Sequence, residues 1–212
     1  MRKIILSLLL ILSLFSCGNK RDYTLFLGYN LDGYVNHLKE NNVDINNSFV
    51  MQKGYISYLY SLVIKDGIDV INNKKISTSI KKSNKIYIQI GNDDFLRCVK
   101  LIDNEYIIDE EVLNTQKELF SYYYFLLIEK LRELYEGNIF ILSPYFPLSN
   151  DLDNMYEIDK ALNEFYEVVN EVCSYFYCVY IDIREINNLI NENYKLSEEC
   201  YSYLDKLIIY GK

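Results

Sequence analysis

The chain has 212 residues, half of them apolar, and carries a formal net charge of −8. An acidic surface repels phosphate backbones, so we expect no nucleic-acid partner. No Pro/Gly/Ser-rich linker divides the sequence. Once an amino-terminal signal is removed, about 195 residues remain, which suffice for one domain with a sizeable core.

The first residues predict export. Arg2 and Lys3 precede an almost wholly apolar run over 4–15, which ends at Ser16 and Cys17. A charged start, a short apolar run and a small residue are typical of a secretory signal. The alternative is a transmembrane anchor, but the run is well short of the roughly 20 residues that cross a bilayer. We therefore predict a signal peptide over 1–16.

Leu14-Phe15-Ser16-Cys17 resembles the lipobox of bacterial lipoproteins, although Phe15 is bulkier than the residue usual in that family. The resemblance implies cleavage before Cys17 and lipidation of this cysteine. Acyl chains on Cys17 would hold the protein at a membrane. We therefore expect a lipoprotein signal over 1–16, a short tether over 17–22 and a domain over 23–212. The protein would be exported and anchored to the bacterial cell membrane or outer membrane.

Beyond the tether, apolar strand patterns alternate with helical spacing. The predicted strands are Tyr23–Asn30, which ends at Gly28, Ser48–Gln52, Ile86–Ile90, Asn138–Ser143 and Cys178–Ile183. The predicted helices are Asp32–Glu40, Ile56–Lys65, Glu110–Glu136 with Gly137 as its stop, Asp151–Tyr177, and a final helix capped by Ser197. This alternation predicts an α/β fold with a parallel sheet and helices on both faces.

The one basic stretch, NNKKISTSIKKSNK from Asn72 to Lys85, has five lysines without helical spacing. We predict a solvated loop here, with contact to an anionic surface as the alternative.

The cysteines other than Cys17 leave two possibilities open. In an oxidising compartment they could form two disulfides, or they could be buried thiols; they are Cys98, Cys173, Cys178 and Cys200. With a single histidine and no C-x-x-C spacing, we expect no zinc site and no cofactor.

In an open parallel sheet, ligands bind beyond the carboxyl ends of the strands. The residues that follow these ends, taken in order, resemble the motifs of the SGNH (GDSL-type) hydrolase family. Gly28-Tyr29-Asn30-Leu31 stands at the first motif, Gly54 at the second and Gly91-Asn92-Asp93-Asp94 at the third. ILSPYFP and VYIDI match the next strands, and ENYKLSEECY matches the motif that opens the last helix. The resemblance implies a three-layer, flavodoxin-like, doubly wound parallel sheet.

The departures from the family fall on its working residues. The resemblance implies a nucleophilic serine where this chain has Asn30, and a histidine base where it has Lys195. The aspartate that orients the base is replaced by Glu192, and the asparagine of the oxyanion hole by Asp93. An amide side chain is no nucleophile, and an ordinary lysine is protonated at neutral pH. We therefore expect no ordinary ester hydrolysis.

Other roles for these side chains stay open. Lys195 with Glu192 is either a surface ion pair or an active pair. Asp93 and Asp94 either form a strand-end turn and cap the helix that follows, or bind a hard cation together with Glu192. His37 is expected to be a surface or core side chain rather than a catalytic base.

The predicted function is that of a lipid-anchored envelope protein with an SGNH-like fold that lacks the catalytic serine and histidine. Its partners would be the membrane, through Cys17, and a small acyl or sugar ligand. The ligand site would consist of Gly28, Asn30, Gly54, Gly91, Asp93 and Lys195. The alternatives are a divergent acyl-ester hydrolase or acyltransferase, and a structural or host-facing surface lipoprotein with a tyrosine-rich exterior.

Overall fold

The structure of the protein is a computed structural model. It describes residues 23–28, 32–41, 43, 47–50, 54–69, 74–103, 105–146, 155–188 and 196–209. The predicted signal peptide, the tether and Cys17 lie outside the described residues.

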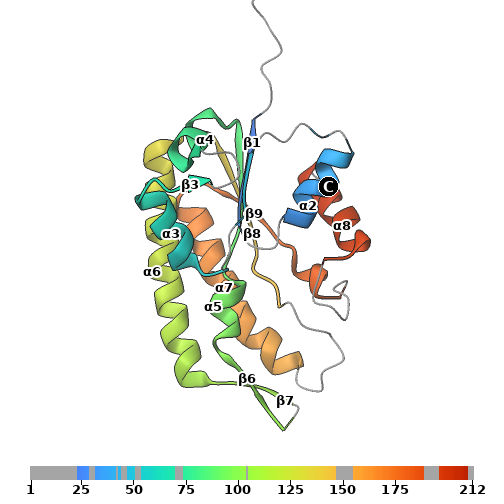
Figure 1. Cartoon of the computed structure of the whole chain (residues 1–212). Helices are drawn as coiled ribbons and strands as arrows, with labels where there is room; N and C mark the ends of the chain where they lie inside the picture. Colours follow the sequence, from blue (N-terminus) through green and yellow to red (C-terminus); the bar gives the residue numbers. More distant parts are fainter. Residues whose placement is uncertain are drawn as a thin grey trace, which may run out of the picture.

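A parallel sheet forms the centre of the described molecule (Figure 1). Its strands have the order β2-β1-β5-β8-β9, and every neighbouring pair is parallel. The strands are β1 (Thr24–Gly28), β2 (Asn47–Val50), β5 (Lys85–Gln89), β8 (Asn138–Leu142) and β9 (Val179–Ile181). Each falls within or next to a strand that the sequence predicts, so the expected parallel sheet is confirmed.

Helices cover both faces of this sheet and make three layers (Figure 1). One face carries α3 (Ile56–Ile64), α6 (Glu110–Leu134) and α7 (Met155–Tyr175), and the other carries α2 (Asp32–Glu40) and α8 (Glu198–Ile208). Ser197 caps α8 as predicted, because its side chain accepts a hydrogen bond from Cys200 N. The α/β three-layer fold class is confirmed.

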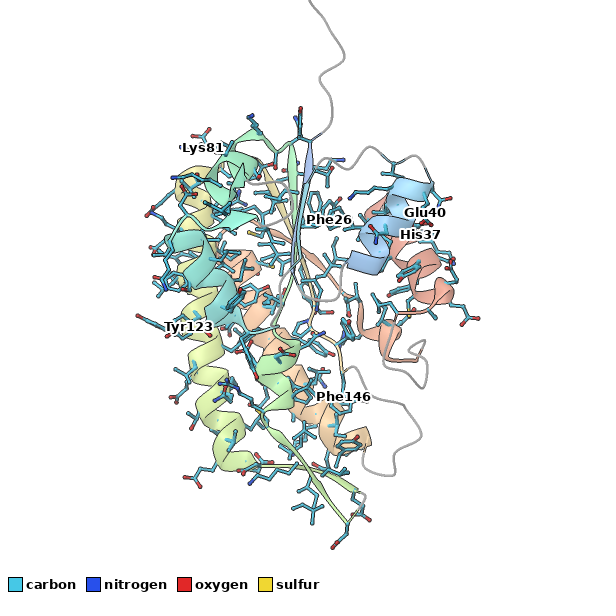
Figure 2. The ribbon with its side chains drawn as sticks, in the orientation of Figure 1. Phe26, His37, Glu40, Lys81, Tyr123 and Phe146 are labelled. Atoms are coloured by element: carbon cyan, nitrogen blue, oxygen red, sulfur yellow. The ribbon has the colours of Figure 1, made fainter. Side chains whose placement is uncertain are left out.

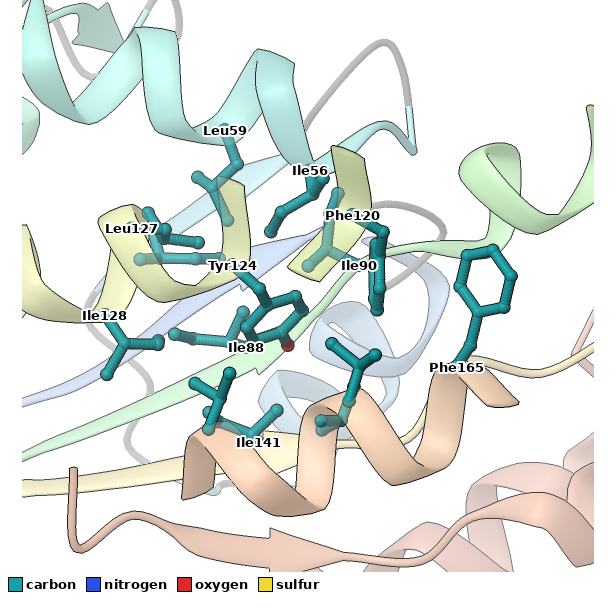
Figure 3. Close-up of a cluster of buried hydrophobic side chains, with 14 of the residues drawn as sticks. Ile56, Leu59, Ile88, Ile90, Phe120, Tyr124, Leu127, Ile128, Ile141 and Phe165 are labelled. Carbon is teal, nitrogen blue, oxygen red and sulfur yellow. The ribbon is translucent and has the colours of Figure 1, made fainter. Parts of the chain in front are cut away.

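Alternate residues of the strands pack into two separate cores, because successive side chains point to opposite faces of a sheet. Ile86 and Ile88 of β5 lie in the core with α3, α6 and α7, whereas Tyr87 lies in the core with α2 and α8. Figure 3 shows the first core, where Phe120 and Tyr124 of α6 meet the strand isoleucines.

The basic stretch is not the solvated loop that the sequence predicts. It contains strand β4 (Lys74–Lys75), paired with β3 (Ile68–Asp69), and helix α4 (Ile76–Lys82). The helix forms because Ile76 and Ile80, four residues apart on one helical face, are fully buried in the core with α3 and α6. Two apolar residues therefore decide the conformation of a segment in which Lys75, Lys81 and Lys82 are exposed.

Three further features differ from the predictions. A short helix, α5 (Asn92–Leu96), follows β5, and an unpredicted antiparallel hairpin joins it to α6; its strands are β6 (Val99–Ile102) and β7 (Glu105–Ile108). Gly137 is not the stop of α6, which ends at Leu134 with Tyr135 in extended backbone conformation. A short 3-10 helix, Arg184–Asn188, follows β9. Among the described residues, no helix is both long and apolar enough to cross a membrane.

We predict that α4 contributes to stability through the face that buries Ile76 and Ile80. Ile80→Ala should lower the free energy of unfolding by about 2–4 kcal/mol, because it removes buried methyl groups and leaves a cavity. Ile64→Ala in α3 is the matched control, since that side chain is 48% exposed, and it should change stability by less than about 0.5 kcal/mol. Urea denaturation compares the two variants, and equal effects would contradict the packing of α4.

Candidate functional site

The candidate site lies at the carboxyl edge of the sheet, where the motif residues follow the strands. Gly28, the last residue of β1, is paired in register with Gln89 of β5. Gln89 in turn pairs with Leu142 of β8. The Gly91–Asp94 motif follows β5 directly and opens α5, which lies at the end of the sheet in Figure 1.

Gly91 turns the chain from β5 into α5 in a conformation that requires glycine. Its φ is +112°, in the left-handed region that side chains disfavour. A Cβ at this position would lie 2.6 Å from the ring of Phe120, so space is lacking as well. The N–H of Gly91 donates a 3.0 Å hydrogen bond to the carbonyl of Gly54. Two glycines of the predicted site are therefore held in contact.

Asp93 and Asp94 bind the segment that leads into α3. Gly54 N donates to Asp93 Oδ2 at 2.7 Å, and Ile56 N donates to Asp94 Oδ2 at 2.7 Å. The guanidinium of Arg97 also lies over the ring of Tyr55, 4.1 Å from its centroid. Neither aspartate caps α5, contrary to the prediction, because its N-cap is Gly91 and has no side-chain cap. Asp94 instead accepts a hydrogen bond from the first residue of α3.

Burial sets the proton affinity of Asp94. Asp94 is 6% exposed, and this burial raises its pKa to about 7. The hydrogen bond from Ile56 N and the charge of Arg97 oppose this effect, since both favour the carboxylate.

Two buried amide side chains, Gln89 and Asn92, lie beside these carboxylates. Asn92 Oδ1 accepts hydrogen bonds from Gln89 Nε2 at 2.9 Å and from Tyr145 N at 3.0 Å. These bonds fix the orientation of the Asn92 amide. Asn92 Nδ2 and Gln89 Oε1 are buried and have no hydrogen-bond partner in the described structure. The site thus keeps one free donor and one free acceptor, which the sequence motifs did not predict.

Ser143 is a further polar residue that sequence reasoning missed. It follows β8, is fully buried, and accepts a hydrogen bond from Ile183 N at 2.9 Å through its hydroxyl. Its own N–H donates to the carbonyl of Ile181 at 3.0 Å. Ser143 therefore joins the ends of β8 and β9.

His37 is a residue of α2, on the face of the sheet that α2 and α8 cover (Figure 2). Its Nε2 is 3.1 Å from Asp205 Oδ2, and Tyr34 donates to the other oxygen of Asp205 at 3.0 Å. Its ring packs against those of Tyr34 and Tyr201. These contacts agree with the expected structural role of His37.

The structure brings together only part of the predicted site. Gly28, Gly54, Gly91 and Asp93 all lie at this edge, whereas Asn30, Glu192 and Lys195 lie outside the described residues. The ion pair of Glu192 with Lys195, and a cation held by Glu192 with Asp93 and Asp94, stay predictions. In the described ranges, no group of three His, Cys, Asp or Glu residues could hold a metal ion. Cys98, Cys173, Cys178 and Cys200 are free thiols in this structure.

The described surface also carries shallow grooves away from this edge. One, of about 470 Å³, lies between α6 and α7 and is lined by acidic side chains with Lys117 and Tyr122. Another of similar volume lies near the ends of these helices, around Arg132 and Tyr175. Neither contains a motif residue, so the carboxyl edge remains the candidate site.

No protein-family model and no curated protein sequence matches the chain. Solved structures do match it. A lipase from a goat rumen metagenome aligns with a TM-score of 0.61 and 16% identity over 86% of this chain and 95% of that one. Acetylxylan esterase Axe2 from Geobacillus stearothermophilus aligns with a TM-score of 0.58 and 14% identity over 89% and 93%. The chain therefore has an SGNH-hydrolase-like α/β fold.

We predict that Asp94 makes stability depend on pH. The pKa of Asp94 is raised in the folded protein, so folding is favoured most when the group is protonated, and this contribution is lost as pH rises from about 4 to about 7. Asp94→Asn keeps an acceptor for Ile56 N and removes the charge. The variant should gain stability relative to the parent as pH rises, by up to about 4 kcal/mol.

Urea denaturation at pH 4.5 and pH 8 measures this difference. Asp103→Asn, in the exposed turn between β6 and β7, is the matched control and should show no such gain. A stability difference between Asp94→Asn and the parent that stays constant with pH would contradict the raised pKa.

Proposed function

We propose that this protein is a lipid-anchored envelope protein whose SGNH-hydrolase-like domain binds a small acyl or sugar ligand without hydrolysing it. The observation that carries the proposal is the 2.7 Å hydrogen bond from Gly54 N to Asp93 Oδ2. In the family that the chain resembles, a glycine N–H and an asparagine side chain stabilise the oxyanion of the reaction. Here Asp93 stands at the asparagine position and accepts the hydrogen of that glycine.

This bond opposes acyl transfer in two ways. A backbone N–H has a single hydrogen, so while Gly54 donates to Asp93 it is not available to a substrate oxyanion. A carboxylate also repels the negative charge that develops on the substrate oxygen. Loss of one oxyanion donor usually costs about 3 kcal/mol of transition-state stabilisation.

The nucleophile and base positions support the same proposal. Structures of the acetylxylan esterase include catalytic mutants in which a serine, an aspartate or a histidine is replaced by alanine. This chain has Asn30 and Lys195 at the serine and histidine positions of the resembled motifs. Its one histidine, His37, is paired with Asp205 between α2 and α8. Loss of the nucleophile and base of a triad costs on the order of a millionfold in rate.

The free amide atoms of the site support binding. Asn92 Nδ2 offers a donor and Gln89 Oε1 an acceptor, both buried and unpartnered in the described structure. A buried polar group without a partner costs roughly 1–3 kcal/mol, which a ligand would recover by pairing with it. A carbonyl would accept from Asn92 Nδ2, and an N–H or hydroxyl would donate to Gln89 Oε1; acylated sugars carry both kinds of group.

A second candidate function is that of a structural or host-facing surface protein. Large exposed aromatic side chains favour it, since tyrosines are well suited to protein interfaces. On the described surface these include Tyr122, Tyr156, Tyr175 and Tyr177.

We predict that the purified protein does not hydrolyse short-chain nitrophenyl esters faster than buffer alone does. The reason is that the nucleophile, the base and the oxyanion donor of the resembled family are all lost. Absorbance of the released nitrophenol measures the rate for the parent and for Asn30→Ala and Lys195→Ala. Lys160→Ala is the matched control, because Lys160 is an exposed residue of α7.

Turnover by the parent that disappears in Asn30→Ala or Lys195→Ala, but not in Lys160→Ala, would overturn the proposal. It would establish the alternative, a divergent acyl-ester hydrolase or acyltransferase that uses these positions.

A further inference from the structure

The fold places the basic segment of this acidic protein at the amino edge of the sheet, opposite the candidate site. Lys81 and Lys82 end α4, and Lys85 begins β5. In Figure 2, Lys81 lies at the end of the molecule where β1 begins, and Phe146, which follows β8, lies toward the other end.

The same segment holds the first described residue of the chain. Asn84 N donates to the carbonyl of Tyr23 at 2.7 Å, and Tyr23 N donates to Asn84 Oδ1 at 2.9 Å. The next residue, Thr24, is paired in register with Lys85. The lysines are therefore fixed beside the point where the predicted tether joins the domain.

Four lysines in the described part of the chain are neutralised by carboxylates, whereas the three of this segment are not. Lys75, Lys100, Lys117 and Lys130 each form an ion pair with a carboxylate. Lys81, Lys82 and Lys85 take part in no ion pair among the described residues, and the first two are exposed. The end of α6 brings Glu129 and Glu133 toward the same end, and Lys130 pairs with Glu133.

The predicted tether is short enough to bring these charges to a membrane. Six residues, 17–22, join Cys17 to Tyr23, and an extended chain spans at most about 3.5 Å per residue, or about 20 Å in all. Lys20 and Arg21 within it add two positive charges. Anionic lipid attracts basic residues that lie within roughly a Debye length of the surface, about 8–10 Å.

We propose that Lys81, Lys82 and Lys85 bind the anionic headgroups of the membrane that carries the lipid on Cys17. The contact would orient the molecule with its amino edge on the membrane and the Gly91 turn facing away from it. This inference rests on the lipid anchor of the proposed function. A lipid anchor combined with a basic patch holds a protein at a membrane more stably than either alone.

Sedimentation with lipid vesicles tests the lysines apart from the anchor. The mature chain, beginning at residue 17 and carrying Cys17→Ser, is mixed with vesicles of phosphatidylcholine that contain or lack phosphatidylglycerol. We expect binding only to the anionic vesicles and its loss at high salt. Lys81→Ala with Lys82→Ala should weaken binding roughly 30-fold, since each lysine near the surface contributes about fivefold.

The control removes two charges at the other end of the molecule, through Lys100→Ala with Lys160→Ala, and should bind like the parent. Circular dichroism verifies that both double variants fold. Equal binding by the two double variants, or no preference of the parent for anionic vesicles, would overturn the proposal. So would capture by soluble polyphosphate without any binding to vesicles, which would assign the lysines to a soluble polyanion.

Labelling of cells with a palmitate analogue tests the anchor separately, with Cys17→Ser as its control. Vesicle binding without labelling would reject the anchor and keep the lysine surface. Labelling without vesicle binding would keep the anchor and reject the lysine surface.

Discussion

The hydrogen bonds that Asp93 and Asp94 accept from Gly54 and Ile56 hold the candidate site together. They connect the turn after β5 to the start of α3, which are far apart in the sequence. Gly54 is bound on both sides, since its carbonyl also accepts from Gly91. Burial of Asp94 limits competition from water for its bond with Ile56 N. The geometry of the carboxyl edge depends on these hydrogen bonds.

The same bonds bear on the proposed loss of hydrolysis. Oxyanion stabilisation requires N–H groups that are held in place and still free to donate. In this site the Gly54 N–H is held in place by a carboxylate and so is no longer free. Ser143 is likewise engaged between the ends of β8 and β9. The amide pair of Gln89 and Asn92 supplies no nucleophile or base, and under the proposed function its unpartnered atoms would bind the ligand.

The sequence predicts the sheet well because its three central strands, β1, β5 and β8, are largely buried. Four of the five residues in Ile86–Ile90 are apolar, and the motif residues follow at the carboxyl edge of the sheet. The sequence does not predict helix α4, because five lysines dominate the segment from Asn72 to Lys85 and only two isoleucines, Ile76 and Ile80, bury the helix. The roles of Asp93 and Asp94 were missed because their donors lie 39 and 38 residues earlier in the chain. Local sequence favours a cap of the adjacent helix, and only the tertiary fold supplies the other donor.

The most direct test is an NMR measurement of the hydrogen bond between Gly54 N and Asp93 Oδ2. In isotope-labelled protein, NMR can detect scalar coupling across a hydrogen bond, here between the Gly54 amide nitrogen and the Asp93 side-chain carboxyl carbon. The account predicts this coupling, slow exchange of the Gly54 amide hydrogen with solvent, and loss of the coupling in Asp93→Ala. A Gly54 amide that exchanges rapidly and shows no coupling would leave the donor free for a substrate and would contradict the account.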